Sequence, residues 1–170
     1  MLQSLKQPTH YDSHPELPLD PDVVKPGEYK WPPHFTPTLQ AIVFIGGCIG
    51  TLARYGIISA TPSQTNNWPL ATFIVNIVGS FLLGLLLRSL FRLGDDKGKL
   101  RLLRLGIGTG FIGAFTTYSS LSVEAALLVK NNHLVIALVY SVSSVIGGII
   151  SCAIGSQIAS WHSTTSRKTT

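Results

Sequence analysis

Charged residues are scarce in this 170-residue chain. Asp, Glu, Lys and Arg make up 12% of it, against about 25% in a typical soluble globular domain, while hydrophobic residues make up 45%. Because a soluble fold needs many charged side chains at its surface, this composition favours a membrane protein over a soluble one.

Residue types that carry catalysis or bind metals are also few. The two cysteines, Cys48 and Cys152, both fall in apolar segments, so we interpret them as small buried residues rather than a disulfide or a metal site. None of the five histidines has metal-site spacing with Cys, Asp or Glu. Glu124 is the single acid within the apolar segments, which excludes a pair of membrane-embedded carboxylates from one chain. We therefore predict that the protein is not an enzyme.

The sequence does contain long hydrophobic runs. Each of four runs has the roughly 20 residues that a membrane-spanning helix requires. They cover 39–60, 68–90, 102–129 and 134–161. The segment before them holds eight of the ten prolines and lacks the apolar core of a secretory signal peptide. We predict a disordered proline-rich tail at 1–37, a four-helix transmembrane domain at 38–162 and a polar tail at 163–170.

The third run contains a weak point for a helix. The stretch from Gly108 to Ser120 holds three glycines, each of which lowers helix stability by about 1 kcal/mol. A helix that breaks at membrane depth must be buried in protein or line a watery cavity, because unpaired backbone groups are costly in hydrocarbon. The freed carbonyls and hydroxyls can then bind an ion. We predict an all-α membrane protein whose third helix is broken near the membrane centre, typical of a channel or transporter.

Basic residues are distributed unevenly about the four predicted spans. Eleven of the thirteen lie in the N-terminal segment, in the connection 88–104 or in the C-terminal segment, which four spans place on one side of the membrane. Arg54 and Lys130 fall toward the other side. By the positive-inside rule, we expect a multi-pass protein of the cell membrane with both termini in the cytoplasm.

Polar residues within the runs recur at helical spacing, which places them on shared faces. Packing between transmembrane helices accounts for many of the glycines and hydroxyls. It accounts less well for Asn76, Arg54 and Glu124, because a primary amide needs several partners and an intramembrane charge is costly. Snorkelling or a structural ion pair is the alternative for the two charges, and a plain core aromatic is the alternative for Tyr118.

Four sequence patterns resemble the Fluc/CrcB fluoride channel family. They occur in order, at matching spacing, from about residue 42 to residue 155. The patterns are GGCIGTLARY at 46–55, ATFIVNIVGSFLLG at 71–84, GFIGAFTTYSSLSVE at 110–124 and YSVSSVIGG at 140–148. Each pattern alone is weak, but all four together in a four-span protein are specific to the family.

The resemblance implies an antiparallel, dual-topology dimer that passes fluoride down its gradient through two pores and so relieves fluoride toxicity. It also implies a structural sodium ion at the dimer centre, bound by the backbone carbonyls of Gly113 and Thr116. The residues implied to line the pores or to bind the anion are Asn76, Thr72, Thr117, Tyr118, Ser120, Leu121, Tyr140 and Ser144. Arg54 and Glu124 are implied to lie near vestibules.

Two features depart from the family pattern. Tyr118 and Leu121 stand where the family usually has phenylalanine. Tyr118 keeps the positively polarised ring edge that can face an anion, whereas Leu121 has no ring. A chain that inserts in both orientations should also have balanced basic residues, and this one does not. We therefore hypothesise a subunit of fixed orientation, paired with a homologous subunit of opposite orientation, with a homodimer as the alternative.

Two other functions stay open at this point. A small proton-coupled exporter of drugs or metabolites also uses four-helix antiparallel dimers, but it needs a carboxylate deep in the membrane. Glu124 lies eight residues beyond Thr116, which suits a vestibule better. The second alternative is a non-conducting structural subunit of a heterodimeric channel, because Leu121 would remove one anion contact.

Overall fold

The computed structural model describes residues 36–61 and 68–166, with side chains described as far as Trp161. Within these ranges all regular structure is helical, and four stretches are long and apolar enough to cross a membrane, which confirms the predicted spans. Three spans are single helices: α1 (Pro37–Ala60), α2 (Leu70–Leu93) and α6 (Leu134–Ser166). The third span consists of α3 (Gly98–Leu103), η2 (Arg104–Ile112), α4 (Gly113–Phe115) and α5 (Tyr118–Lys130).

Several helix ends follow from proline and glycine. Pro37 stands in the first turn of α1, where its missing N–H costs no hydrogen bond. Gly94 follows α2 with a φ of 128°, a conformation that glycine adopts without strain. Apart from its last two residues, the predicted tail at 1–37 lies outside the described residues. At the other end α6 reaches Ser166, so the first four residues of the predicted C-terminal tail are helical.

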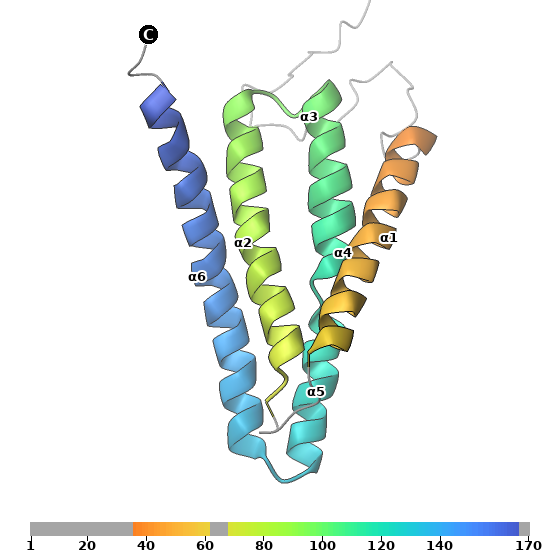
Figure 1. Ribbon diagram of the computed structural model, residues 1–170, viewed down its shortest axis with the longest axis vertical. Coiled ribbons are helices and arrows are strands. Elements are labelled where there is room, and N and C mark those ends of the chain that lie inside the picture. The colour runs from red at the N-terminus through yellow and green to blue at the C-terminus, as the bar shows by residue number, and fades with distance from the viewer. Residues whose placement is uncertain (1–35, 62–67, 167–170) are drawn as a thin grey trace, which may run out of the picture.

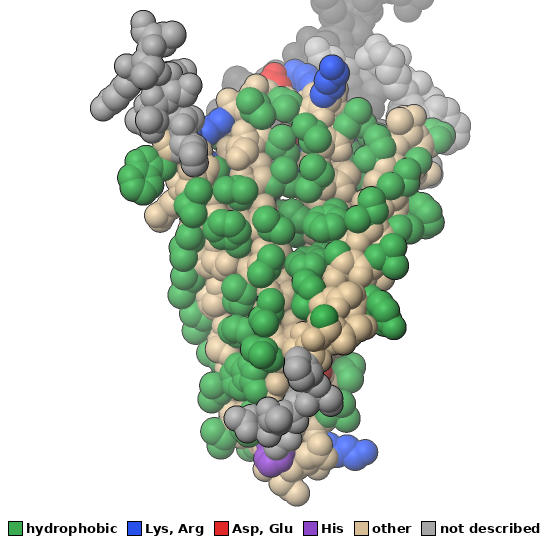
Figure 2. Space-filling view, viewed as in Figure 1, with side chains coloured by type: hydrophobic (Ala, Val, Ile, Leu, Met, Phe, Trp, Pro, Cys, Tyr) green, Lys and Arg blue, Asp and Glu red, His purple; other side chains and the backbone are tan. Residues whose placement is uncertain are grey.

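The spans stand side by side and alternate in direction (Figure 1). The start of α1, the α2–α3 connection and the end of α6 lie at one end, and the α5–α6 turn lies at the other. The main packing contacts join α2 to α6 and α1 to η2. Figure 2 shows hydrophobic side chains over the band between the ends, with Lys and Arg at the ends. An apolar band of this kind suits hydrocarbon rather than water.

Glycines let the packed helices touch backbone to backbone. A Cβ added to Gly84 on α2 would collide with the carbonyl of Cys152 on α6. A Cβ on Gly50 of α1 would likewise collide with the carbonyl of Phe111 on η2. Three further glycines stand in the same relation to a facing carbonyl: Gly46, Gly110 and Gly155. Small residues at these points are what allow close approach without a hydrophobic driving force.

We predict that Gly84→Ala destabilises the protein by about 1–3 kcal/mol, because the new methyl group must push α2 and α6 apart. Gly56→Ala is the matched control, since a Cβ there meets nothing within 4 Å and alanine favours the helix. Thermal unfolding of the purified variants in detergent checks this. Equal midpoints for the two variants would contradict the role given to backbone contact between α2 and α6.

Candidate functional site

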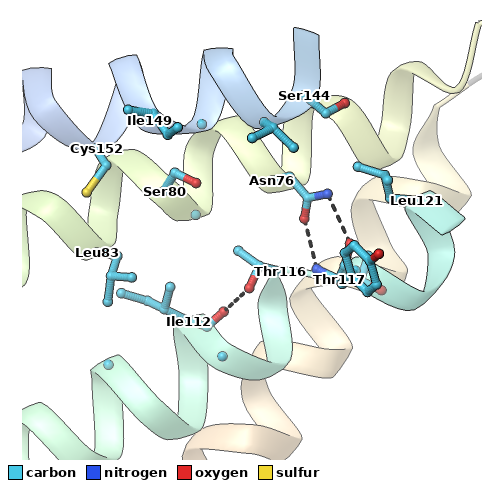
Figure 3. Close-up of a pocket in the computed structure, with 16 residues that line it drawn as sticks. Asn76, Ser80, Leu83, Ile112, Thr116, Thr117, Leu121, Ser144, Ile149 and Cys152 are labelled. Atoms are coloured by element: carbon cyan, nitrogen blue, oxygen red, sulfur yellow. Dashed lines mark hydrogen bonds between the residues drawn. The ribbon is translucent and has the colours of Figure 1, made fainter. Parts of the chain in front are cut away.

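A cavity of about 560 Å³ lies between α2, α6 and the third span. Figure 3 shows the side chains that line it. Five of the eight predicted pore residues line it: Asn76, Thr117, Tyr118, Leu121 and Ser144. The two predicted carbonyl donors also line it: Gly113 and Thr116. The structure thus gathers most of the candidate residues around one space.

The side chain of Asn76 on α2 forms hydrogen bonds with the third span between the end of α4 and the start of α5. Its Oδ1 accepts a hydrogen bond from the N–H of Thr117 at 2.8 Å, and its Nδ2 donates to the carbonyl of Thr117 at 3.0 Å (Figure 3). Thr116 and Thr117 both have extended backbone torsions, with ψ of 158° and 122°. The amide therefore satisfies both backbone groups of a residue that lies outside the helical hydrogen-bonding pattern, as membrane burial requires.

Thr117 also provides the N-cap of α5. Its Oγ1 accepts the N–H of Ser120 at 3.1 Å, and it donates to the hydroxyl of Ser120 at the same distance. A side-chain oxygen at this position satisfies one of the free N–H groups of the first turn. Ser120, which was predicted to face the pore, therefore contributes to the cap and does not line the cavity.

Two backbone carbonyls lose the partners that a continuous helix would provide. The carbonyl of Gly113 would accept from Thr117, and that of Thr116 from Ser120, each four residues on. Instead, the N–H of Thr117 donates to Asn76 and the N–H of Ser120 donates to the Thr117 hydroxyl. Both carbonyls belong to residues of the cavity wall. Neutral carbonyl oxygens in this setting fit the ligand preference of a hard cation such as Na⁺.

Ser144 on α6 has a buried hydroxyl with no hydrogen-bond partner among the described residues. The residue is 5% exposed and lines the cavity. Neighbouring Ser143 differs, because its hydroxyl donates to the carbonyl of Tyr140. A buried hydroxyl without a partner costs about 1–3 kcal/mol and calls for a ligand or a functional reason.

A second polar cluster lies among α2, α5 and α6, away from the cavity lining. The hydroxyls of Thr72 and Tyr140 donate to the two carboxylate oxygens of Glu124, each at 2.7 Å. The ring of Trp68 meets that of Tyr140 edge to face at 5.5 Å. The sequence predicted two pore residues and a vestibule residue here, and the structure brings them together.

Trp68 was absent from the predicted site residues. Helical spacing could not have found it, because α2 begins at Leu70 and Trp68 precedes the helix. Arg54 joins neither cluster. It is half-buried on α1 and forms no hydrogen bond or ion pair with other described residues.

We predict that Asn76→Leu lowers the free energy of unfolding by about 1–3 kcal/mol, because the N–H and C=O of Thr117 lose their partners in an apolar setting. Ser80→Ala is the control, since Ser80 lines the same cavity without a hydrogen bond to other described residues. Chemical or thermal denaturation in detergent measures both. A stability loss no larger than that of the control would contradict the clamping role of Asn76.

Taken together, four apolar helices define a multi-pass membrane protein, and a partly polar cavity beside a non-helical segment is typical of channels and transporters. The family model described as CrcB-like protein, Camphor Resistance (CrcB), matches residues 41–156, and the chain belongs to this family. This confirms the family resemblance seen in the sequence.

Three relatives illustrate the similarity. The fluoride-specific ion channel FluC 1 of Cutibacterium acnes is 44% identical over 114 residues, which cover 67% of this chain and 80% of that protein. FluC 2 of Leifsonia xyli is 40% identical over 104 residues, 61% of this chain and 71% of the relative. FluC of Ignicoccus hospitalis is 37% identical over 123 residues, 71% of this chain and 96% of the relative.

Proposed function

We propose that this protein is a subunit of a fluoride-selective channel, which lets fluoride leave the cell passively and so relieves its toxicity. Membership of the CrcB family and the similarity to three proteins named as fluoride-specific channels support this function. The structural observation that carries it is the buried hydroxyl of Ser144, which has no partner among the described residues and belongs to the cavity wall.

Fluoride holds its water tightly, so a pore must offer hydrogen-bond donors in exchange. Ser144 offers a hydroxyl. The Asn76 amide has two N–H donors, of which one bonds Thr117, leaving the second for an anion in the cavity. Tyr118 also lines the cavity, and the residue is 82% exposed in the single subunit, so the positive edge of its ring can face an anion.

The position of Glu124 favours a channel over a proton-coupled exporter. An exporter of that class needs a carboxylate at which substrate and proton compete. Both carboxylate oxygens of Glu124 accept hydroxyl hydrogen bonds, from Thr72 and Tyr140, and the residue is not part of the cavity lining. Glu124 therefore serves to hold α2, α5 and α6 together rather than to bind substrate.

A structural sodium ion fits the carbonyl donors of the third span. In this proposal the oxygens of Gly113 and Thr116 from two subunits hold the ion at the dimer centre. The hydrogen bonds that divert Thr117 and Ser120 away from these carbonyls support the assignment. When bound, the cation supplies positive charge that ties the two third spans together at their central break.

The partner in the proposed dimer is a homologous subunit of opposite orientation. The support is the charge imbalance of this chain, with eleven of its thirteen basic residues on the side assigned to the cytoplasm, together with both termini. Leu121 lines the cavity without a ring, so the partner supplies the aromatic edge that is missing at this position. A homodimer is the alternative.

We predict that Ser144→Ala slows fluoride efflux from liposomes about tenfold, because removing one donor to a desolvated anion costs about 1.4 kcal/mol or more. Ser143→Ala is the matched control, since that hydroxyl is already bonded to its own helix. A fluoride electrode follows efflux from vesicles containing equal amounts of protein. Equal rates for the two variants would contradict the anion-binding role of Ser144.

A further inference from the structure

A second hollow, of about 450 Å³, lies where the last turns of α2 meet the last turns of α6. It is at the end of the bundle that also holds the α2–α3 connection (Figure 1). Its lining consists of Arg92, Ile154, Gln157, Ile158, Ser160 and Trp161. The proposed ion cavity shares none of these residues. We propose that this hollow binds an anionic phospholipid.

Arg92 of α2 lines the hollow, and Arg88 lies one turn earlier on the same helix. Nη1 of Arg92 donates to the carbonyls of Ser160 at 2.8 Å and Ala159 at 3.3 Å. Nε of Arg88, one turn earlier, donates to the hydroxyl of Ser160 at 3.0 Å. These bonds fix both side chains against α6 but use only one nitrogen of each. A guanidinium has five N–H donors, so most of them remain available to a phosphate.

The positive charge of Arg88 and Arg92 is not neutralised by a described carboxylate. The two acids nearest along the chain are engaged elsewhere: Asp95 pairs with Lys97 at 3.1 Å, and Asp96 pairs with Arg104 at 2.7 Å. Arg92 in the hollow and Arg88 one turn away thus carry positive charge with no carboxylate partner among the described residues, and this charge calls for an anion. This is the charge complementarity that selects an acidic headgroup over a zwitterionic one.

The apolar part of the hollow identifies the occupant as a lipid rather than a free phosphate. Ile158 and Ile154 are one turn apart on α6 and are 38% and 47% exposed. They form an apolar wall that leads away from the arginines toward the middle of the span. Trp161 marks the headgroup level, because it is 79% exposed at the polar end of the span, where tryptophan is enriched. A diacyl lipid would place its phosphate at Arg92 and a chain along the isoleucines.

The test is native mass spectrometry of the full chain, purified in detergent and given equal amounts of phosphatidylglycerol and phosphatidylcholine with identical acyl chains. We expect phosphatidylglycerol to be retained at least fivefold more than phosphatidylcholine. Arg92→Gln should abolish this preference. Lys99→Gln, which removes the same charge from α3 outside the hollow, should keep it. Equal retention of the two lipids by the unaltered protein would overturn the proposal without depending on the folding of any variant.

Two further experiments identify what the hollow recognises. Ile158→Trp leaves both arginines in place but fills the apolar wall, and it should reduce phosphatidylglycerol retention several-fold. An excess of inorganic phosphate should leave retention unchanged. Displacement of the lipid by phosphate, with no effect of Ile158→Trp, would show a simple anion site and refute lipid binding. Equal losses in Arg92→Gln and Lys99→Gln would show general charge attraction and refute the hollow as the site.

Discussion

The two hydrogen bonds between the Asn76 amide and the backbone of Thr117 set the arrangement on which the rest of the site depends. They satisfy a residue whose backbone is extended in the middle of an apolar span, where unpaired groups cost several kcal/mol. By occupying the N–H of Thr117, the amide also leaves the carbonyl of Gly113 without its helical partner. One side chain therefore joins α2 to the third span, stabilises the extended segment and leaves the Gly113 oxygen outside the helical hydrogen-bonding pattern.

The Asn76 side chain can form hydrogen bonds with another span only because the spans pack closely. Gly84 and Gly155 bring α2 and α6 into backbone contact, and Gly50 does the same for α1 and η2. The cavity lies between α2, α6 and the third span. Its wall combines apolar residues with a few hydroxyls and one amide. In such a wall the unpaired hydroxyl of Ser144 is the donor to which we assign the largest effect on fluoride in the proposed function.

The sequence was sufficient to predict the four spans, because length and hydropathy alone decide them. It also singled out Asn76, since an amide at membrane depth needs several partners. The residues with extended backbone are Thr116 and Thr117, whereas Gly108 and Gly110 lie within the π-helix η2 and Gly113 begins α4. Glycine weakens a helix by about 1 kcal/mol, which is less than the cost of unpaired backbone groups. The chain therefore leaves the helical conformation at Thr116 and Thr117, where side chains replace the lost backbone hydrogen bonds.

The meeting of Thr72, Glu124 and Tyr140 could not be predicted, because it depends on the relative rotation of three helices, which periodicity within each helix does not define. The same holds for the arginines of α2 and the carbonyls of α6. Hydropathy locates each span, but the depth at which two spans face each other follows from backbone contacts such as that of Gly84 with Cys152. The sequence therefore predicted the residues of the site better than it predicted which residues on other helices they contact.

The most direct test of the proposed function is fluoride efflux from liposomes, with the purified chain alone and after co-expression with a homologous subunit. We expect passive efflux that is selective for fluoride over chloride, independent of a proton gradient, and fullest with the homologous subunit present. Full efflux from the chain alone would support fluoride conduction but replace the two-subunit arrangement with a homodimer. Absence of fluoride efflux in both preparations would contradict the proposed channel function.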